Sequence, residues 1–369
     1  MTTPQDADRP IVIAAGGTGG HLFPAQALAQ ELGGRGHVIH LMTDSRVNRY
    51  SAAFPAAEIH EIRSATFGLR EPLKILPSIM TLLQGYREAR RIMIRLRACA
   101  AVGFGGYPTL PPLVAATRLG LPTCIHEQNA VIGRANRLLA SRVNVVAGTF
   151  PDPKHLAPAL AGKYRLTGNP VRQTAKAHAA TPYRPRGDGE PFRVVVFGGS
   201  QGARVMSEIV PRAIYALAKT VKPEVVQQCR EEDIEAVREV YQTSGVEAEI
   251  APFFNDLPEK IGTSHLVICR AGASTIGELA LIGRPAILVP LPHSLDQDQR
   301  ENALRFVNSG GGWLVEQEAF TTDRLATMLT EISGDGQGLA RRAAAALAFS
   351  RPDAEKALAD VVEEMIARQ

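Results

Sequence analysis

Two glycine-rich segments stand where a strand could lead directly into a helix. Residues 16–20 (GGTGG) follow an apolar run at residues 11–15, and residues 198–202 (GGSQG) follow a second apolar run at Phe192–Phe197. Glycine lets a backbone approach an anion closely, and a helix N-terminus offers N–H groups and the positive end of a dipole. Each segment therefore predicts an anion site, and the pair suits a ligand that carries a diphosphate.

Polar residues follow two further predicted strands. His126, Glu127, Gln128 and Asn129 are consecutive, and four polar side chains in a row are costly to bury without partners. This cluster fits a solvated loop or a functional site equally well. Residues 291–302 (LPHSLDQDQREN) are rich in amides and acids that can bind sugar hydroxyls. On the helix predicted to follow residues 271–274, Glu278 can accept both hydroxyls of a ribose.

The sequence lacks the complete motifs of several common enzyme classes and cofactor sites. From Gly17 the dinucleotide-binding pattern is only partial, because its sixth position is Leu22, although Asp44 ends the next predicted strand, where a ribose-binding acid would stand. No P-loop, HExxH or GxSxG motif occurs. The four cysteines are far apart and lack metal-ligand spacing, so we expect no metal and no other cofactor.

The elements that must position these residues repeat in both halves of the chain. The first half predicts strands at residues 11–15, 38–42, 100–102 and 122–125, with helices that extend to residues 32 and 119. The second half predicts strands at Phe192–Phe197, Leu266–Cys269 and residues 286–289, with a helix that extends to residue 282. This order predicts two doubly wound α/β domains, whose ligands bind beyond the carboxyl ends of the strands.

Two further segments complete this organisation. Residues 182–191 are rich in proline, glycine and charge, and predict a loop near a domain boundary. Apolar residues between Ala354 and Ile366 recur at helical spacing and predict an amphipathic C-terminal helix.

Composition and charge are ordinary except in one stretch. The chain has 369 residues, 45% of them hydrophobic, and a net charge of +4, which fits two globular domains and excludes general disorder. Residues 69–97 hold seven arginines and lysines against two glutamates, a local charge of 7 − 2 = +5, interleaved with apolar residues. This stretch fits a solvated helix face or an anionic membrane surface, and no nucleic-acid partner is expected. We also expect no signal peptide and no membrane span.

Seven motifs in order along the chain resemble the MurG family of peptidoglycan glycosyltransferases. They are AGGTGGHLFP at residues 15–24, GFGGYP at 103–108, HEQNAVIGRAN at 126–136, TGNPVR at 167–172, GGSQGAR at 198–204, RAGASTIGEL at 270–279, and residues 290–303. The resemblance implies a GT-B fold with two Rossmann-like domains that face each other across a cleft. It places the acceptor and membrane-facing domain at residues 1–171 and the donor domain at 172–350. Residues 351–369 would form a helix that packs back on the first domain.

The resemblance also implies an activity and a set of site residues. The enzyme would move N-acetylglucosamine (GlcNAc) from UDP-GlcNAc, with inversion, to undecaprenyl-diphosphate-linked N-acetylmuramyl pentapeptide (lipid I), forming lipid II. Glu278 would bind the ribose, the backbone of Phe254 the uracil, and Gln299 the sugar, with Gln297 as the alternative. The remaining residues implied to bind the donor are Thr18, Gly19, Gly20, Asn129, Arg172, Ser200, Ala273, Ser274 and Thr275.

Catalysis and localisation complete the expectations. Inversion in one displacement needs a general base, and His21 is the first candidate and Glu127 the second, while the alternative role for His21 is to orient the acceptor diphosphate. The resemblance implies a peripheral enzyme on the cytoplasmic face of the bacterial inner membrane, with other cell-wall and division proteins as further partners. A UDP-sugar epimerase of the same fold, an NAD-dependent oxidoreductase and a non-catalytic scaffold are the competing hypotheses.

Overall fold

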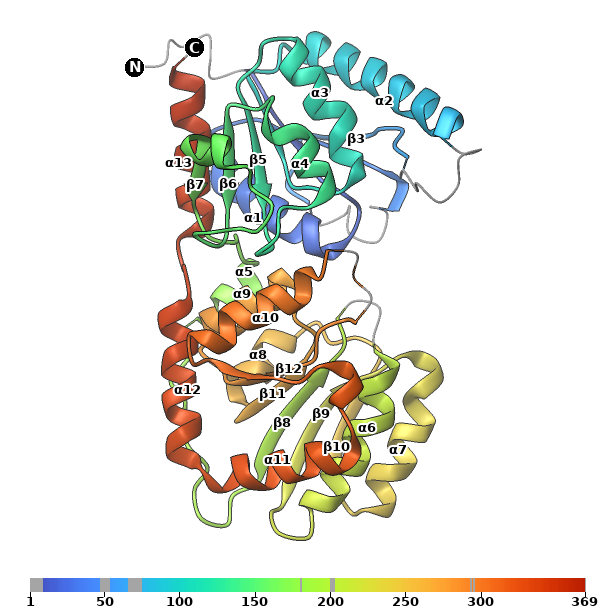
Figure 1. Cartoon of the computed structure of the whole chain (residues 1–369), viewed down its shortest axis with the longest axis vertical. Coiled ribbons are helices and arrows are strands. Elements are labelled where there is room, and N and C mark those ends of the chain that lie inside the picture. Colours follow the sequence, from blue (N-terminus) through green and yellow to red (C-terminus); the bar gives the residue numbers. More distant parts are fainter. Residues whose placement is uncertain are drawn as a thin grey trace. The chain divides into compact units, whose positions relative to one another are not determined.

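The computed structural model describes residues 9–46, 54–65, 75–179, 181–199, 203–292, 294 and 296–368. Contacts divide the chain into two compact units. Unit 1 is Met1–Arg172 together with Asp353–Gln369, and unit 2 is Gln173–Pro352. The chain therefore enters unit 2 once and returns to unit 1 through its last helix (Figure 1).

Unit 1 is built on a parallel sheet of seven strands in the order β3-β2-β1-β4-β5-β6-β7. The central strands are short and wholly buried runs of apolar residues, as expected where helices cover both faces of a parallel sheet. The strands are β1 Ile11–Ala14, β2 Ile39–Thr43, β3 Glu58–Glu61, β4 Ala100–Gly103, β5 Thr123–Glu127, β6 Val145–Gly148 and β7 Tyr164–Leu166.

Helices cover both faces of this sheet (Figure 1). A separate apolar core lies between each face and the helices that cover it. Helices α1 and α13 pack on one face, where Leu28 and Leu358 are fully buried. Helices α2, α3 and α4 pack on the other face, where Met93, Leu113 and Leu139 are buried. Their bounds are α1 Gly19–Gly34, α2 Ile75–Leu96, α3 Leu110–Arg118, α4 Arg134–Ala140 and α13 Ala354–Ala367, with 3-10 turns at Tyr107–Thr109 and Pro158–Lys163.

The last helix, α13, is held on α1 by charge as well as by its apolar face. Arg35, at the C-terminal end of α1, donates to Asp360 at 2.6 Å and to Glu363 at 2.7 Å, and His37 lies 2.9 Å from Glu363. Burial alone would lower the pKa of Arg35, but hydrogen bonds to the carboxylates of Asp360, Glu31 and Glu363 raise that pKa. The predicted C-terminal helix is present, and its buried stripe includes Leu358, Val362 and Met365.

Unit 2 repeats the architecture with a six-stranded parallel sheet in the order β10-β9-β8-β11-β12-β13. Its strands are β8 Phe192–Phe197, β9 Pro223–Gln228, β10 Glu247–Ala251, β11 Leu266–Cys269, β12 Ala286–Leu288 and β13 Gly312–Leu314. Helices α6, α7 and α11 cover one face, and α8, α9, α10 and α12 the other. The helices are α5 Gln173–Lys176, α6 Arg204–Leu217, α7 Ile234–Thr243, α8 Leu257–Thr263, α9 Ala273–Ile282, α10 Asp298–Asn308, α11 Thr322–Gly334 and α12 Gly336–Phe349, with 3-10 turns at Glu231–Asp233 and Gln317–Ala319.

The predicted α/β class with two Rossmann-like domains is confirmed. In both sheets the first strand of the unit is central, flanked by its second strand on one side and its fourth on the other. Strand order reverses at that point, so the carboxyl ends of β1 and β4, and of β8 and β11, mark the places where such sheets bind ligands. Strands β8 and β11 and the end of α9 fall where the sequence predicts them.

Candidate functional site

In each unit we call the edge of the sheet at the carboxyl ends of its strands the ligand edge. In unit 1 two glycine-rich turns of this edge, one after β1 and one after β4, meet at His21. The imidazole lies in the first turn of α1, with Nδ1 3.0 Å from the hydroxyl of Thr18. A Cβ placed on Gly105 would lie 3.4 Å from the ring of His21, and one on Gly106 would lie 3.5 Å from it. Both glycines have positive φ, 82° and 76°, which other residues rarely adopt. The half-buried imidazole therefore rests against the turn that follows β4.

The neighbouring glycines of the first turn differ in role. Gly19 is buried, and a Cβ there would lie 2.9 Å from the ring of Phe23, so a side chain at this position would have to displace that ring. Gly20 and Thr18 are exposed at the helix N-terminus, and nothing lies within 4 Å of a Cβ on Gly20. An anion can therefore approach this backbone closely.

At the end of β5 the carboxylate of Glu127 is saturated with hydrogen bonds. Oε1 accepts from the backbone N–H of Asn129 at 3.0 Å and from its side-chain amide at 3.2 Å. Oε2 accepts from the N–H of Gly133 and the amide of Asn136, both at 2.8 Å. The side chain is buried, and burial raises the pKa of Glu127 while these hydrogen bonds oppose that shift. Its geometry fits a residue that fixes the segment from Asn129 to Asn136, which includes the first turn of α4.

Two other members of the polar cluster, His126 and Gln128, are also buried, whereas Asn129 is half-buried. Gln128 donates to the carbonyl of Phe104 at 2.9 Å, which ties β5 to the turn after β4. His126 donates through Nε2 to the carbonyl of Gly168 at 2.8 Å, and burial lowers its pKa to about 4, so the ring is neutral. Asn169 is 5% exposed, and its amide has no hydrogen-bond partner among the residues that the structure describes.

Arg172 ends the first of the two segments of unit 1, and its guanidinium lies 4.6 Å from the ring centroid of Phe23 in α1. Phe23 is the residue that also closes over Gly19. Within unit 1, therefore, the structure brings Thr18, Gly19, His21 and Arg172 to one edge of the sheet through α1. Asn129 lies at the same edge, after β5.

In unit 2 the N-terminus of α9 follows β11, the strand that corresponds to β4 of unit 1. Gly272 precedes the helix, and Ala273, Ser274 and Thr275 form its first turn. The hydroxyl of Ser274 is buried and finds no hydrogen-bond partner in the described part of the chain. Glu278 follows one turn later and is 7% exposed. The second glycine turn begins with Gly198 and Gly199, the latter with φ 86°, and Ser200 lies outside the described residues.

A buried cation ties together the loops around α9. Arg270 donates through Nη1 to the carbonyls of Val289 and Pro290, both at 3.0 Å, and through Nη2 to Gln317 at 2.6 Å. Burial lowers the pKa of Arg270. From α10, Asn302 donates to the carbonyl of Ala271 at 3.2 Å. These hydrogen bonds fix the loop after β11 relative to the loop after β12.

Two more predicted residues lie on flanking loops of unit 2. Oε1 of Gln299 accepts from the N–H of Leu291 at 3.1 Å. This hydrogen bond orients the side chain of Gln299 within the 290–303 motif. Phe254 is 9% exposed in the loop after β10, with Lys260 over its ring at 5.2 Å. Gln297 precedes α10 with a left-handed backbone, φ 50°.

Arg270 and His126 lie within the family-like motifs, but the sequence predicts no individual role for either. A signal for Arg270 exists, since an arginine directly after a buried apolar strand must find partners. No comparable signal shows that Gln128 reaches Phe104, because that contact joins two separate strand ends.

Family models match both units of the chain. Residues 11–147 match the glycosyltransferase family 28 N-terminal domain, and residues 193–358 match the glycosyltransferase family 28 C-terminal domain. One relative, from Chelativorans sp. (strain BNC1), is 51% identical over 97% of this chain and 95% of its own length, and another, from Rhizobium johnstonii, is 49% identical over 97% and 96%. Both are named UDP-N-acetylglucosamine–N-acetylmuramyl-(pentapeptide) pyrophosphoryl-undecaprenol N-acetylglucosamine transferase.

Solved structures agree with this assignment. MurG from Acinetobacter baumannii matches with a TM-score of 0.78 at 28% identity, over 96% of this chain and 99% of its own. A UDP-N-acetylglucosamine 2-epimerase from Listeria monocytogenes matches with a TM-score of 0.68 at 12% identity, over 98% of each chain, which is a likeness of fold alone. The predicted GT-B class is confirmed, and the chain belongs to glycosyltransferase family 28 and, within it, to the MurG family.

Proposed function

We propose that this protein transfers GlcNAc from UDP-GlcNAc to undecaprenyl-diphosphate-linked N-acetylmuramyl pentapeptide, with inversion at the anomeric carbon. The observation that carries the proposal is 51% identity, over nearly the whole chain, to a transferase whose name states these substrates. The epimerase alternative is not favoured, because it is supported only by a likeness of fold at 12% identity.

One assay tests this activity directly. UDP release is measured with UDP-GlcNAc in the presence and absence of a short-chain analogue of the lipid-linked acceptor. The proposal expects release that depends on the acceptor. An epimerase converts the sugar nucleotide without that dependence, and a scaffold releases no UDP with any acceptor, so either result contradicts the transferase.

The donor is proposed to bind at the ligand edge of unit 2. The N–H groups of the first turn of α9 are suited to the diphosphate, because they lie at a helix N-terminus. The glycine-rich segment 198–202 stays a second predicted diphosphate site. The buried hydroxyl of Ser274 supports a polar ligand there. Glu278 is proposed for the ribose, Phe254 for the uracil and Gln299 for the sugar. Ser200, Thr18, Gly19, Gly20, Asn129 and Arg172 stay predicted contributors.

His21 is proposed as the general base. If Nδ1–H donates to Thr18, the basic lone pair of the ring is at Nε2, which can take the proton from the acceptor hydroxyl. The new bond forms between that oxygen and the anomeric carbon as the bond to the diphosphate oxygen breaks. The helix N-termini of unit 2 then stabilise the charge on the departing UDP. Glu127 is the weaker candidate because both of its oxygens already accept hydrogen bonds.

Replacing His21 by alanine is expected to lower kcat by about 10²–10⁴-fold, the usual contribution of general base catalysis. The pH–rate profile should also lose the limb that deprotonation of the general base produces. Steady-state kinetics across pH measure both effects, with His155→Asn as a control at an exposed histidine of unit 1. A change of less than about tenfold would assign His21 to acceptor orientation instead.

Replacing Glu127 by glutamine separates positioning from catalysis. One carboxylate oxygen becomes an NH₂ group that faces N–H donors, so unfolding free energy should fall by about 1–3 kcal/mol. Activity should fall with it while the shape of the pH–rate profile is retained. Chemical denaturation and kinetics measure these effects, and Glu61→Gln, at an exposed strand end, is the control. Unchanged stability with a lost pH limb would make Glu127 the base.

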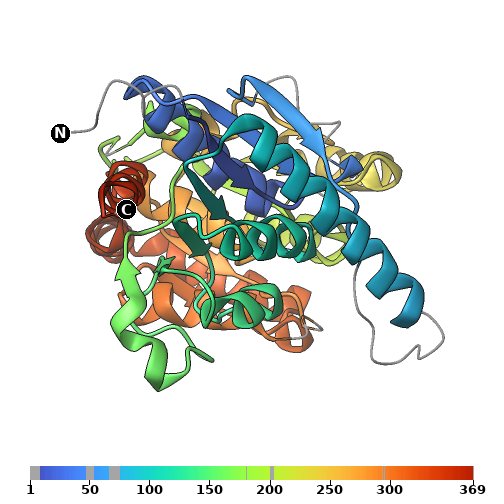
Figure 2. The same ribbon diagram turned by 90° about the horizontal axis from the view of Figure 1, so that it is seen from above.

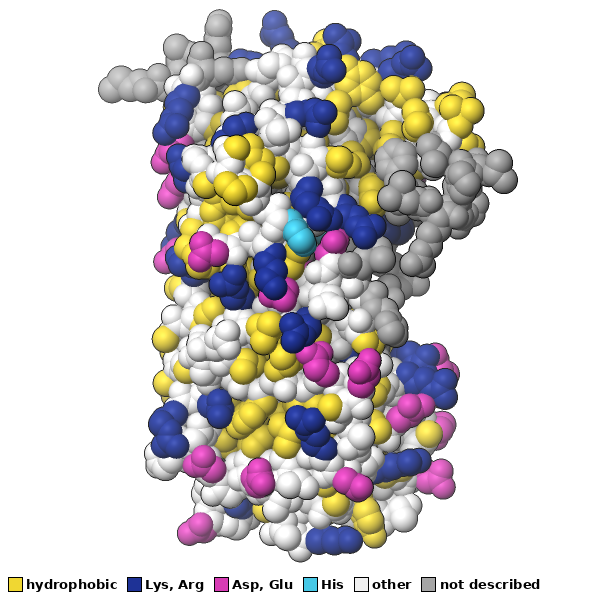
Figure 3. Space-filling model, viewed as in Figure 1, with side chains coloured by type: hydrophobic (Ala, Val, Ile, Leu, Met, Phe, Trp, Pro, Cys, Tyr) yellow, Lys and Arg dark blue, Asp and Glu magenta, His cyan; other side chains and the backbone are white. Residues whose placement is uncertain are grey.

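Helix α2 is proposed to contact an anionic membrane. Its buried face holds Ala89 and Met93, whereas Leu76, Met80 and Leu83 are 68%, 56% and 48% exposed. The exposed arginines at positions 87, 90 and 91 fall on the same helical face as these apolar residues, because they continue the spacing of three and four. Figure 3 shows hydrophobic and basic side chains gathered over α2.

The two halves of α2 support this contact differently. Its C-terminal half packs on the sheet and along α3, and its N-terminal half extends beyond α3 (Figure 2). In the described part of the chain, none of the helices combines the length and apolar character that a membrane crossing requires. From the exposed apolar and basic face of α2 we propose a peripheral position on the cytoplasmic face of the inner membrane, with other cell-wall and division proteins as neighbours there.

Neutralising Arg87, Arg90 and Arg91 to glutamine should weaken binding to anionic vesicles by roughly 3 kcal/mol, at about 1 kcal/mol for each charge. Vesicle sedimentation measures the partition. A matched triple variant at Arg184, Arg324 and Arg341, exposed residues of unit 2, should change it little. If the unmodified protein binds neutral and anionic vesicles equally, the electrostatic part of the proposal fails.

A further inference from the structure

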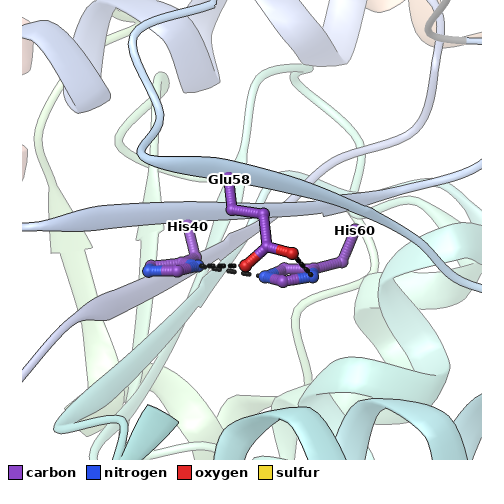
Figure 4. Close-up of side chains that lie close together, drawn as sticks. All are labelled: His40, Glu58 and His60. Atoms are coloured by element: carbon purple, nitrogen blue, oxygen red, sulfur yellow. Dashed lines mark hydrogen bonds and ion pairs between the residues drawn. The ribbon is translucent and has the colours of Figure 1, made fainter.

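Outside the ligand edges, two histidines and a glutamate lie together on β2 and β3 (Figure 4). In the parallel register His40 pairs with Glu58, and Met42 pairs with His60. Because side chains of paired residues, and of residues two apart, point to the same face, all three side chains share one face of the sheet. That face is the one on which Met42 packs in the core beneath α2 and α3. His40 and His60 are each 7% exposed, whereas Glu58 is exposed.

The geometry is close to that of a metal-ligand set. Nδ1 of His40 is 3.0 Å from Nε2 of His60 and 3.9 Å from Oε2 of Glu58. One ligand atom from each residue lies within 4.8 Å of the others. Around a tetrahedral Zn²⁺ with bonds of about 2.0–2.1 Å, ligand atoms are roughly 3.3–3.4 Å apart. The two nitrogens are slightly closer together than this and the carboxylate is farther away, so Glu58 must approach the two rings for the cluster to become a three-ligand site.

The electrostatic setting also suits a bound cation. Both imidazoles are buried, and each has a ring nitrogen within 4 Å of a carboxylate oxygen of Glu58. Glu58 adds one negative charge to the ligand set. Arg95 of α2 opposes it, since burial and the charge of Arg95 both lower the pKa of the two histidines. The exposed carboxylate leaves one side of the cluster to solvent, where water can complete the coordination.

We propose that His40, Glu58 and His60 bind a divalent transition-metal ion of the Zn²⁺ class through two nitrogens and one oxygen. The ion joins β3, the edge strand of the sheet, to β2. The segment that leaves β3 is in turn bound to α2, where Arg63 donates to Gln84 at 2.9 Å and to Glu88 through its N–H at 3.3 Å. The site is thus a structural clamp at the edge of unit 1, and it is independent of the proposed transferase activity.

The competing explanation is a hydrogen bond between the two imidazoles with no metal, and titration of the whole metal-free protein with Zn²⁺ distinguishes the two. Isothermal calorimetry should give one ion per chain, and thermal unfolding should shift upward with added Zn²⁺. Glu58→Gln keeps the shape of an exposed side chain, so it should fold normally, yet bind at least about 100-fold more weakly, because even outer-shell partners are worth about 10–100-fold. His60→Ala should abolish the site.

The control is His155→Asn, which removes an exposed histidine outside the cluster and should leave Zn²⁺ affinity and the thermal shift unchanged. Visible absorption of bound Co²⁺ reports the ligand set and should disappear in Glu58→Gln and His60→Ala. The proposal is overturned if the unmodified protein binds no ion. It is equally overturned if Glu58→Gln binds Zn²⁺ as the unmodified protein does, because binding then lies elsewhere.

Discussion

The carboxylate of Glu127 is the group on which the ligand edge of unit 1 depends. Four N–H donors converge on its two oxygens, and all four come from residues within ten positions of it in the sequence. A buried carboxylate is tolerated only when it is fully hydrogen-bonded, so the loop from Asn129 to Asn136 must adopt the one conformation that supplies these donors. Asn136 then links this loop to the carbonyl of His126, and β5 gains a rigid end.

In unit 2 the loops that follow the strands are held by buried arginines rather than by a carboxylate. Arg270 holds the loop after β12 through two backbone carbonyls, and Arg284, 2% exposed, donates to carbonyls of Thr181, Ile282 and Gly283. Loop ends in a parallel sheet expose carbonyl groups that have no partner in the ladder, and a planar guanidinium can satisfy several at once. In both units, therefore, a buried charged side chain fixes the loops that present the predicted substrate-binding residues.

The proposed membrane helix and the proposed metal site are linked by the same sheet edge. Helix α2 packs its C-terminal half on the face of the sheet that carries His40 and His60, while its N-terminal half leaves apolar side chains in solvent. Gly85 allows this close packing, since a Cβ there would lie 2.0 Å from the carbonyl oxygen of Arg63. An edge strand is held by one neighbour only, so additional links to β2 and α2 have a greater effect there than in the sheet centre.

The sequence alone predicts the fold class, and it predicts β8, β11 and the end of α9 to the residue. Continuous apolar runs bounded by glycine are informative because a strand covered on both faces must be apolar at every position. Seven ordered motifs also identify the family, and the comparisons confirm that assignment. The candidate site residues that the motifs supply, such as His21, Glu127 and Glu278, stay predictions.

Only the tertiary structure decides which contacts these residues make. The sequence treats Glu127 and His21 as competing bases, and the donors around Glu127 depend on how one loop folds back on β5. His40, Glu58 and His60 form no sequence motif, because their proximity comes from the register of two parallel strands. Local pattern determines which segments become strands and helices, whereas contacts between segments distant in the sequence depend on register and packing, which no local pattern encodes.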